Sequence, residues 1–275
     1  MVSRQSSAGG WAVAVIVLAA VVAAGGYLAY RAMHPEAPPT PVAAPAGTAT
    51  TAANAPMEHH PIMQASAPAS ASTAPLPPLD DSDASVRSAL GALPGGDGLL
   101  ALLIPSQIIP RIVATVDALP RHTLGRSVLP VQAPKGAFVA LQSGGATVAD
   151  PRNAERYAPY LQALQGVDTQ ALVDGYVHAY PLFQQAYRQL GYPHGYFNDR
   201  LIVAIDNLLA TPELAQPAAL TAVNGHYEYA DPSLEALSAG QKILLRTGPA
   251  DEAAIKARLR EIRARLTGRS LPAAP

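Results

Sequence analysis

The sequence predicts a mainly α-helical fold: a multi-helix domain around a central helical hairpin with a few short β-strands, preceded by one transmembrane helix and a disordered linker. Three observations carry this prediction. Apolar residues recur at helical spacing through most of the second half, an uncharged apolar run lies near the N-terminus, and a Pro- and Ala-rich stretch separates the two. We therefore divide the chain into residues 1–10 as a short head, 11–30 as the transmembrane helix, 31–78 as the linker, 79–267 as the folded domain and 268–275 as a disordered tail.

The central hairpin is expected within residues 168–211. Pro181 should kink its first arm or divide it, and Asn198 should cap its second arm through the side-chain oxygen. In both arms apolar and aromatic residues step by three or four positions, which places them on one stripe of each helix. These residues are Leu172, Tyr176, Tyr180, Phe183, Tyr187 and Leu190 in the first arm, and Leu201, Ile202, Ile205, Leu208 and Leu209 in the second.

The other elements follow from capping residues, turn residues and apolar spacing. Helices are expected after residues 80–83, over residues 106–119, from Asp150 and Pro151 to Gly166, from Asp231 and Pro232 to Gly248, and along the stripe of Ile255, Leu259, Ile262 and Leu266. A small β-hairpin is expected around Gly144 and Gly145, and a further extended piece over residues 220–229.

Charge and composition exclude some classes of function. The formal net charge is −1, whereas nucleic-acid binders usually carry a large basic excess, so we expect no nucleic-acid partner. The chain has no cysteine, which removes disulfides, thiolate zinc sites and a cysteine nucleophile together.

The predicted membrane span is residues 11–30, WAVAVIVLAAVVAAGGYLAY, which contain no charged residue. A helix of this length covers the hydrocarbon core of about 30 Å, and aromatic rings near both ends suit the headgroup regions. The alternative is a cleaved signal peptide, whose apolar region is normally shorter. Arg4 and Arg31 flank the span on opposite sides, so the positive-inside rule does not favour either orientation strongly. Because the head before the span is short, we expect it to stay cytoplasmic and the rest of the chain to be exported.

The linker is rich in Ala, Pro, Thr and Ser and shows no hydrophobic period. As flexible coil it spans roughly 35–40 Å, and as polyproline II it approaches about 130 Å, so it holds the domain away from the bilayer. His59 and His60 lie within it; two adjacent imidazoles without further ligands bind metal weakly, so an exposed pair is favoured over a metal site.

Several motifs appear in one order along the domain: residues 112–120 (IVATVDALP), 157–160 (YAPY), 180–183 (YPLF), 190–193 (LGYP), 195–201 (GYFNDRL), 208–212 (LLATP), 227–232 (YEYADP) and 237–242 (LSAGQK). Together they resemble the bacterial family catalogued as domain of unknown function 3014. The resemblance implies proteobacterial proteins with one N-terminal span, a Pro/Ala-rich linker and this domain. It brings no reaction and no catalytic residues.

The loop between the hairpin arms is the candidate ligand or partner surface. Its aromatic side chains could stack on a ligand while its polar side chains bind it by hydrogen bonds. The alternative is structural, with the aromatics filling the end of the hairpin and the polar groups capping or forming ion pairs. The residues concerned are Tyr196, Phe197, Asn198, Asp199 and Arg200.

Two further pairs of polar residues could support chemistry. Asp174 and His178 are four residues apart and share one helix face, and His226 and Glu228 lie on one side of an extended piece. No HExxH pattern, phosphate loop or nucleophile elbow accompanies them. We therefore assign no catalytic, cofactor-binding or metal-ligating residue and expect no cofactor. The aromatic stripe of the first arm could line a ligand groove, but core packing is favoured.

The last helix carries a series of basic residues, which could contact anionic lipid or an acidic partner but is more typical of a solvated face. The residues are Lys256, Arg258, Arg260, Arg263 and Arg265, and Arg269 follows beyond the helix.

From this layout we expect a single-pass protein of the bacterial inner membrane, anchored in the lipid bilayer through residues 11–30, with a C-terminal periplasmic domain. The favoured role is a non-enzymatic binding or scaffolding module of the cell envelope with an envelope protein as its partner. Two alternatives stay open: an envelope hydrolase with a site near residues 195–200, and a structural spacer.

Overall fold

The computed structural model describes residue 60, residues 76–224 and residues 226–267. The predicted span at residues 11–30, most of the linker and the tail at residues 268–275 lie outside this part of the chain. Within it, no helix combines the length and the apolar composition that crossing a bilayer requires.

The described chain is mainly helical with a few short strands, as predicted. It begins with the short 3-10 helix η1 (Leu79–Asp81), followed by α2 (Ser82–Gly91), α3 (Gly96–Leu102) and α4 (Ile108–Ala118). The helices expected after residue 82 and within residues 106–119 are confirmed. The carboxylate of Asp83 in α2 accepts the main-chain N–H groups of Gln107 and Ile108, so one helix caps the start of another.

Helix α3 has no counterpart among the expected elements, because its seven residues are too few to show a period. It packs on α5 (Ala158–Gly166) through a close approach of two glycines. Gly95 has φ +78°, and a Cβ there would lie 2.1 Å from the carbonyl oxygen of Gly166. Only glycine fits both the dihedral angle and the space.

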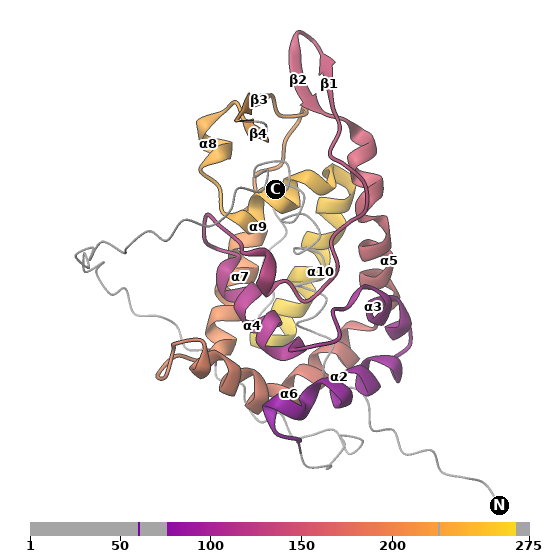
Figure 1. Ribbon diagram of the computed structural model, residues 1–275, viewed down its shortest axis with the longest axis vertical. Helices are drawn as coiled ribbons and strands as arrows, with labels where there is room; N and C mark the ends of the chain where they lie inside the picture. Colours follow the sequence, from indigo (N-terminus) through magenta and orange to yellow (C-terminus); the bar gives the residue numbers. More distant parts are fainter. Residues whose placement is uncertain (1–59, 61–75, 225, 268–275) are drawn as a thin grey trace, which may run out of the picture.

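The two predicted extended regions are both β-hairpins. β1 (Ala140–Ser143) pairs antiparallel with β2 (Ala146–Ala149), and β3 (Leu220–Val223) pairs antiparallel with β4 (His226–Tyr229). An isolated bridge between Val148 and Ala219 joins the hairpins. They lie together at one end of the molecule, with α2 and α6 at the other (Figure 1).

Both helices expected in the central hairpin are present, as α6 (Thr169–Gln189) and α7 (Phe197–Leu209), but each packs more on α4 and α10 than on the other. Asp168 caps α6 by accepting the N–H of Ala171 at 2.8 Å. α6 continues through Pro181, so the expected division of this arm is wrong; the proline removes a single main-chain donor, and buried residues anchor the helix on both sides. The expected cap at Asn198 is also wrong, because α7 begins before that residue and its side chain faces the interior.

The C-terminal helices are α8 (Pro232–Glu235), α9 (Ala239–Thr247) and α10 (Pro249–Thr267), and the 3-10 helices η2 (Arg126–Val128) and η3 (Pro151–Tyr157) complete the series. One helix was expected from Asp231 to Gly248. The structure divides it because Ser238 and Gln241 form a reciprocal capping box that starts α9 afresh.

The start of α9 meets the end of α4 head to tail. The N–H groups of Ala239 and Gly240 donate to the carbonyl oxygens of Arg121 and Leu119, at 2.7 and 3.0 Å. A Cβ at Gly240 would lie 2.9 Å from the side chain of Leu208 and 3.1 Å from the Leu119 oxygen, so a larger residue would hold the two helix ends apart.

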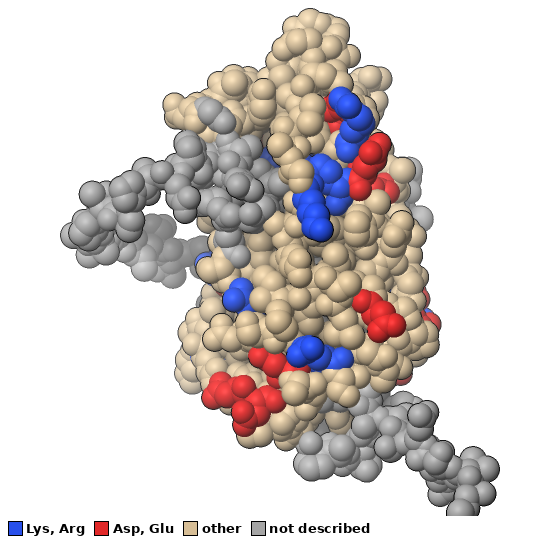
Figure 2. All heavy atoms as spheres, turned by 45° about the vertical axis from the view of Figure 1, so that its right-hand side comes forward, with Lys and Arg blue, Asp and Glu red and all other residues tan. Residues whose placement is uncertain are grey.

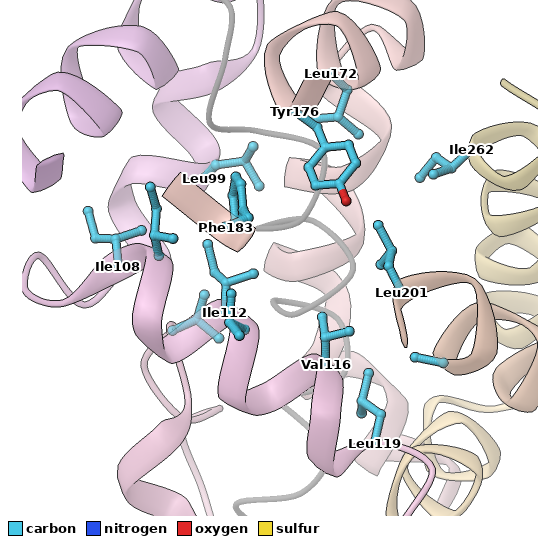
Figure 3. Close-up of a cluster of buried hydrophobic side chains, with 14 of the residues drawn as sticks. Leu99, Ile108, Ile112, Val116, Leu119, Leu172, Tyr176, Phe183, Leu201 and Ile262 are labelled. Atoms are coloured by element: carbon cyan, nitrogen blue, oxygen red, sulfur yellow. The ribbon is translucent and has the colours of Figure 1, made fainter. Parts of the chain in front are cut away.

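The core forms where α4, α6, α7 and α10 converge. Figure 3 shows side chains of α6, α7 and α10 directed toward the apolar face of α4. The most deeply buried large side chains come from several helices: Tyr176, Phe183, Phe197, Leu90, Leu99, Ile108, Ile109, Ile112, Leu119, Leu172 and Ile205. The aromatic stripe of α6 is therefore mainly core, as favoured.

The basic residues of α10 are largely used within the domain. The Lys256 ammonium is buried, donates to the carbonyl oxygen of Thr211 and lies 2.7 Å from Glu252. Arg258 donates to main-chain oxygens at the α5–α6 corner, and Arg263 pairs with Asp206 of α7. The favoured prediction of a solvated basic face therefore does not hold for Lys256, Arg258 and Arg263, which bind groups of the domain.

Replacing Arg258 with Ala should destabilise the domain by about 2–3 kcal/mol, because it leaves partly buried carbonyl oxygens without a charged donor. Arg265 on the same helix is more exposed, and its change to Ala should cost less than about 1 kcal/mol. Urea unfolding of both variants measures the difference. Equal losses would contradict the corner-binding role.

Acid should weaken the fold through Glu235 and Glu261. Burial acts to raise the pKa of each, but hydrogen bonds, including those from Lys242 to Glu235 and from Thr169 to Glu261, leave both pKa values lowered from the usual 4.5. Their stabilising contribution is therefore full above that pH and lost as the pH falls through the lower folded-state values. Unfolding free energies measured between pH 6 and pH 3 should fall, and Glu235→Gln should flatten the decline.

Candidate functional site

The loop that leads into α7 is held by the side chain of Gln184 in α6. Its amide nitrogen donates to the carbonyl oxygen of Gly195 at 2.7 Å, and its oxygen accepts the N–H of Phe197 at 2.9 Å and the hydroxyl of Tyr180 at 2.8 Å. One buried amide thereby satisfies main-chain groups on both sides of Tyr196, which fixes where α7 begins.

Aromatic packing places the first turn of α7 against α6. The ring of Phe197 stacks on Phe183, with centroids 5.7 Å apart and planes at 7°, and contacts Tyr176 and Tyr187 at an angle. Tyr187 in turn stacks on Tyr192 at 4.5 Å. Phe197 is fully buried, so it supports the loop and offers no surface to a ligand.

The hydroxyl of Tyr176 in α6 orients the side chain of Asn198. The Tyr176 hydroxyl donates to Asn198 Oδ1 at 3.1 Å, and complete burial raises the pKa of this tyrosine well above its usual value, so the hydroxyl keeps its proton. With its oxygen satisfied, Asn198 directs its amide nitrogen toward the main-chain oxygen of His60, to which it donates at 2.7 Å.

Asp199 completes the contact with His60. Its Oδ1 accepts the main-chain N–H of His60 at 2.8 Å. Consecutive side chains of α7 therefore hold the donor and the acceptor of one residue that lies about 140 positions away along the chain. We call Asn198 and Asp199 the main-chain clamp.

Arg200 serves the fold. Its guanidinium binds the Oδ1 of Asp117 at 2.9 Å and also donates to the main-chain oxygen of that residue. The second carboxylate oxygen of Asp117 accepts from Arg121 at 2.5 Å and from the Tyr192 hydroxyl at 3.2 Å. This cluster ties α4 to the hairpin, consistent with the ion-pair alternative.

The five predicted surface residues thus separate into three groups. Asn198 and Asp199 form the clamp, Phe197 and Arg200 support it, and Tyr196 lies beside it with 52% of its surface exposed. The sequence reasoning missed His60 as the contacting group, because a main-chain contact leaves no side-chain pattern. One available signal was Pro61, which biases the preceding residue toward extended backbone.

The remaining polar candidates do not join the clamp through the contacts that the structure shows. Asp174 accepts from Gln170 one turn earlier, at 2.7 Å, and His226 pairs with Glu228 at 2.9 Å on β4. In the part of the chain that is described, no group of three or more His, Asp or Glu side chains could hold a metal ion.

Charged side chains on the face in Figure 2 form small groups of both signs between wide uncharged areas.

These features define a helical domain that holds the main chain of one distant residue, His60, on the first turn of α7. The chain belongs to the family described as "Protein of unknown function (DUF3014)", whose model matches residues 108–263 and so includes the clamp and its supports. The comparisons with curated proteins and with solved structures gave no match.

Changing Gln184 to Ala should destabilise the domain by about 2–3 kcal/mol, since it strands the N–H of Phe197 and the oxygen of Gly195 in a buried place. Gln184→Glu keeps an oxygen for both accepted hydrogen bonds, and at a pH that protonates the carboxyl its O–H can also donate to the Gly195 oxygen, so its loss should be smaller there than that of Gln184→Ala. Chemical denaturation combined with hydrogen exchange at residues 195–199 measures both effects. Unchanged exchange in Gln184→Ala would contradict the role of this amide.

Proposed function

We propose that this protein is a membrane-tethered cell-envelope binding module whose domain holds extended polypeptide segments of a partner, without chemical turnover. The observation that carries the proposal is the main-chain clamp, in which Asn198 donates to the oxygen of a residue and Asp199 accepts from its nitrogen.

This pair of contacts suits a polypeptide ligand better than a small molecule. The N–H and C=O of one residue form a donor–acceptor pair that every amino acid except proline presents, so the clamp reads backbone and tolerates side chains. The amide of Asn198 is fully buried and already oriented by Tyr176, so little ordering remains to be done on binding. Selectivity would come from groups beside the clamp, with the exposed ring of Tyr196 as the nearest candidate.

The proposed setting is the bacterial inner membrane. Residues 11–30 form the single span, residues 31–78 the linker, and the domain faces the periplasm, where its partner is an envelope protein that presents an extended segment. The uncharged run, the short head before it and the Pro/Ala-rich stretch after it support this arrangement.

The two alternatives receive less support. A hydrolase near residues 195–200 would use a convergent set of polar residues: Asp199, Arg200, Asp174 and His178. Instead, Arg200 binds Asp117, Asp174 binds Gln170, and Asp199 accepts from the main chain of His60. A pure spacer would give no reason for a buried, preoriented amide that contacts a distant part of the chain.

Binding can be tested with the peptide of residues 55–65, APMEHHPIMQA, and full-length His60→Pro protein in detergent micelles. In this variant the chain's own residue 60 lacks its N–H and so competes less for the clamp. We expect saturable binding by fluorescence polarisation. Asp199→Ala in the same chain should weaken it roughly 10- to 100-fold, the value of one hydrogen bond to a charged group. Val203→Ala, on the exposed side of α7, is the matched control and should bind normally.

The peptide itself supplies a second control. N-methylation of the nitrogen at the His60 position should abolish binding, whereas alanine at that position should preserve it. No saturable binding by the unmodified peptide, or equal binding by the N-methylated one, would refute main-chain recognition.

The membrane arrangement predicts that a reporter active only outside the cytoplasm, fused to the C-terminus, is active, and that the full chain stays in the membrane fraction until detergent is added. An inactive reporter with a membrane-bound chain would reverse the topology. Recovery of the full chain in the soluble fraction without detergent would refute the proposed membrane anchor at residues 11–30.

A further inference from the structure

We propose that His60 of the linker is the resident occupant of the main-chain clamp, so that a partner segment binds by displacing the protein's own chain. This inference rests on the proposed function and adds its regulation.

The contact is specific in geometry. Both main-chain polar groups of His60 are engaged, at 2.7 and 2.8 Å, by two side chains of the same helical turn. The residue is partly buried against the domain, while Asn198 and Asp199 are both buried.

The local sequence suits this role. Pro61 disfavours helical backbone at the residue before it and favours the extended form. His60 itself retains an N–H, so it can use both halves of the clamp. Both hydrogen bonds come from its main chain, so a residue other than proline at position 60 could make the same pair.

The position of His60 in the chain makes the internal occupant a strong competitor. Only residues 61–75 connect it to the described start of the domain at Leu76. A connection of this length gives an effective concentration on the order of millimolar. A segment with weak intrinsic affinity therefore fills the site for much of the time, and the apparent affinity for a partner falls with the fraction of sites left open.

Displacement would also change the tether. While His60 is bound, the chain between the predicted span and the domain is fixed at residue 60, so residues 61–75 do not add to the reach. Release of His60 returns them to the linker. Partner capture and a longer reach are then two results of one event.

The chain has no cysteine, so two can be introduced for spin labels in full-length protein in micelles. We choose His59→Cys beside the occupant and Val203→Cys on the exposed side of α7. Pulsed electron paramagnetic resonance should show one narrow distribution of distances between the labels at positions 59 and 203 when no other residue is changed. His60→Pro or Asp199→Ala should broaden it, and His60→Ala, which keeps the N–H, should leave it narrow.

The binding arm uses the 55–65 peptide with unlabelled protein. His60→Pro should bind it at least threefold more tightly than the unaltered chain, and His60→Ala should match the unaltered chain. Excess peptide should broaden the narrow distance in the labelled protein. Agreement between the distance measurement and the peptide binding supports the proposal. Because His60→Pro and Asp199→Ala remove the contact from opposite sides, misfolding of one variant cannot by itself produce the result.

The failures are distinguishable. Equal affinity of the peptide for the unaltered and His60→Pro chains, with a broad distance in both, overturns internal occupancy and leaves the binding function standing. The distance distribution between the labels could instead be narrow and broaden only in the clamp variants, while the peptide binds to no chain. In that case residue 60 is held permanently by its own domain. That result overturns displacement together with the proposed function.

Discussion

The burial of the Phe197 ring is the constraint on which the candidate site depends. Phe197 is the first residue of α7, and its ring lies among the aromatic side chains of α6. Once that ring is buried, the next two residues have fixed directions because a helix rotates by a set angle per residue. Asn198 then meets Tyr176 and donates to the main-chain oxygen of His60, and Asp199 beside it accepts the N–H of that same residue.

Gln184 and Asp117 hold this arrangement from two sides. Gln184 satisfies the main chain ahead of Phe197, and Asp117 takes up Arg200 just after the clamp. The same short stretch therefore contains residues that make the surface and residues that make the support. Composition alone does not separate them, because either role uses a polar side chain.

The long helices were predictable from sequence since each shows a sustained period. α4, α6 and α10 bury the residues that their spacing selects, and Asp168 caps α6 as its position indicates. Two of the differences have local causes: α3 is too short to show a period, and Ser238 starts a new helix through a capping box that spans only four residues. The third is tertiary: a cap is the commonest use of Asn at a helix start, but the Asn198 side chain is buried and contacts Tyr176. The five candidate residues lie together at the start of α7, as their sequence positions require, but the contact with His60 joins segments that share no pattern.

The contact between α9 and α4 has a consequence for the order in which the chain can fold. The carbonyl oxygens at the end of α4 receive their partners from Ala239 and Gly240, more than a hundred residues later. Until those residues have been synthesised, the carbonyl oxygens of Leu119 and Arg121 can bond only to water, beside a core that also awaits α10. These hydrogen bonds and the packing of α10 can therefore form only when almost the whole domain has been synthesised, which makes the closing of this core a late step.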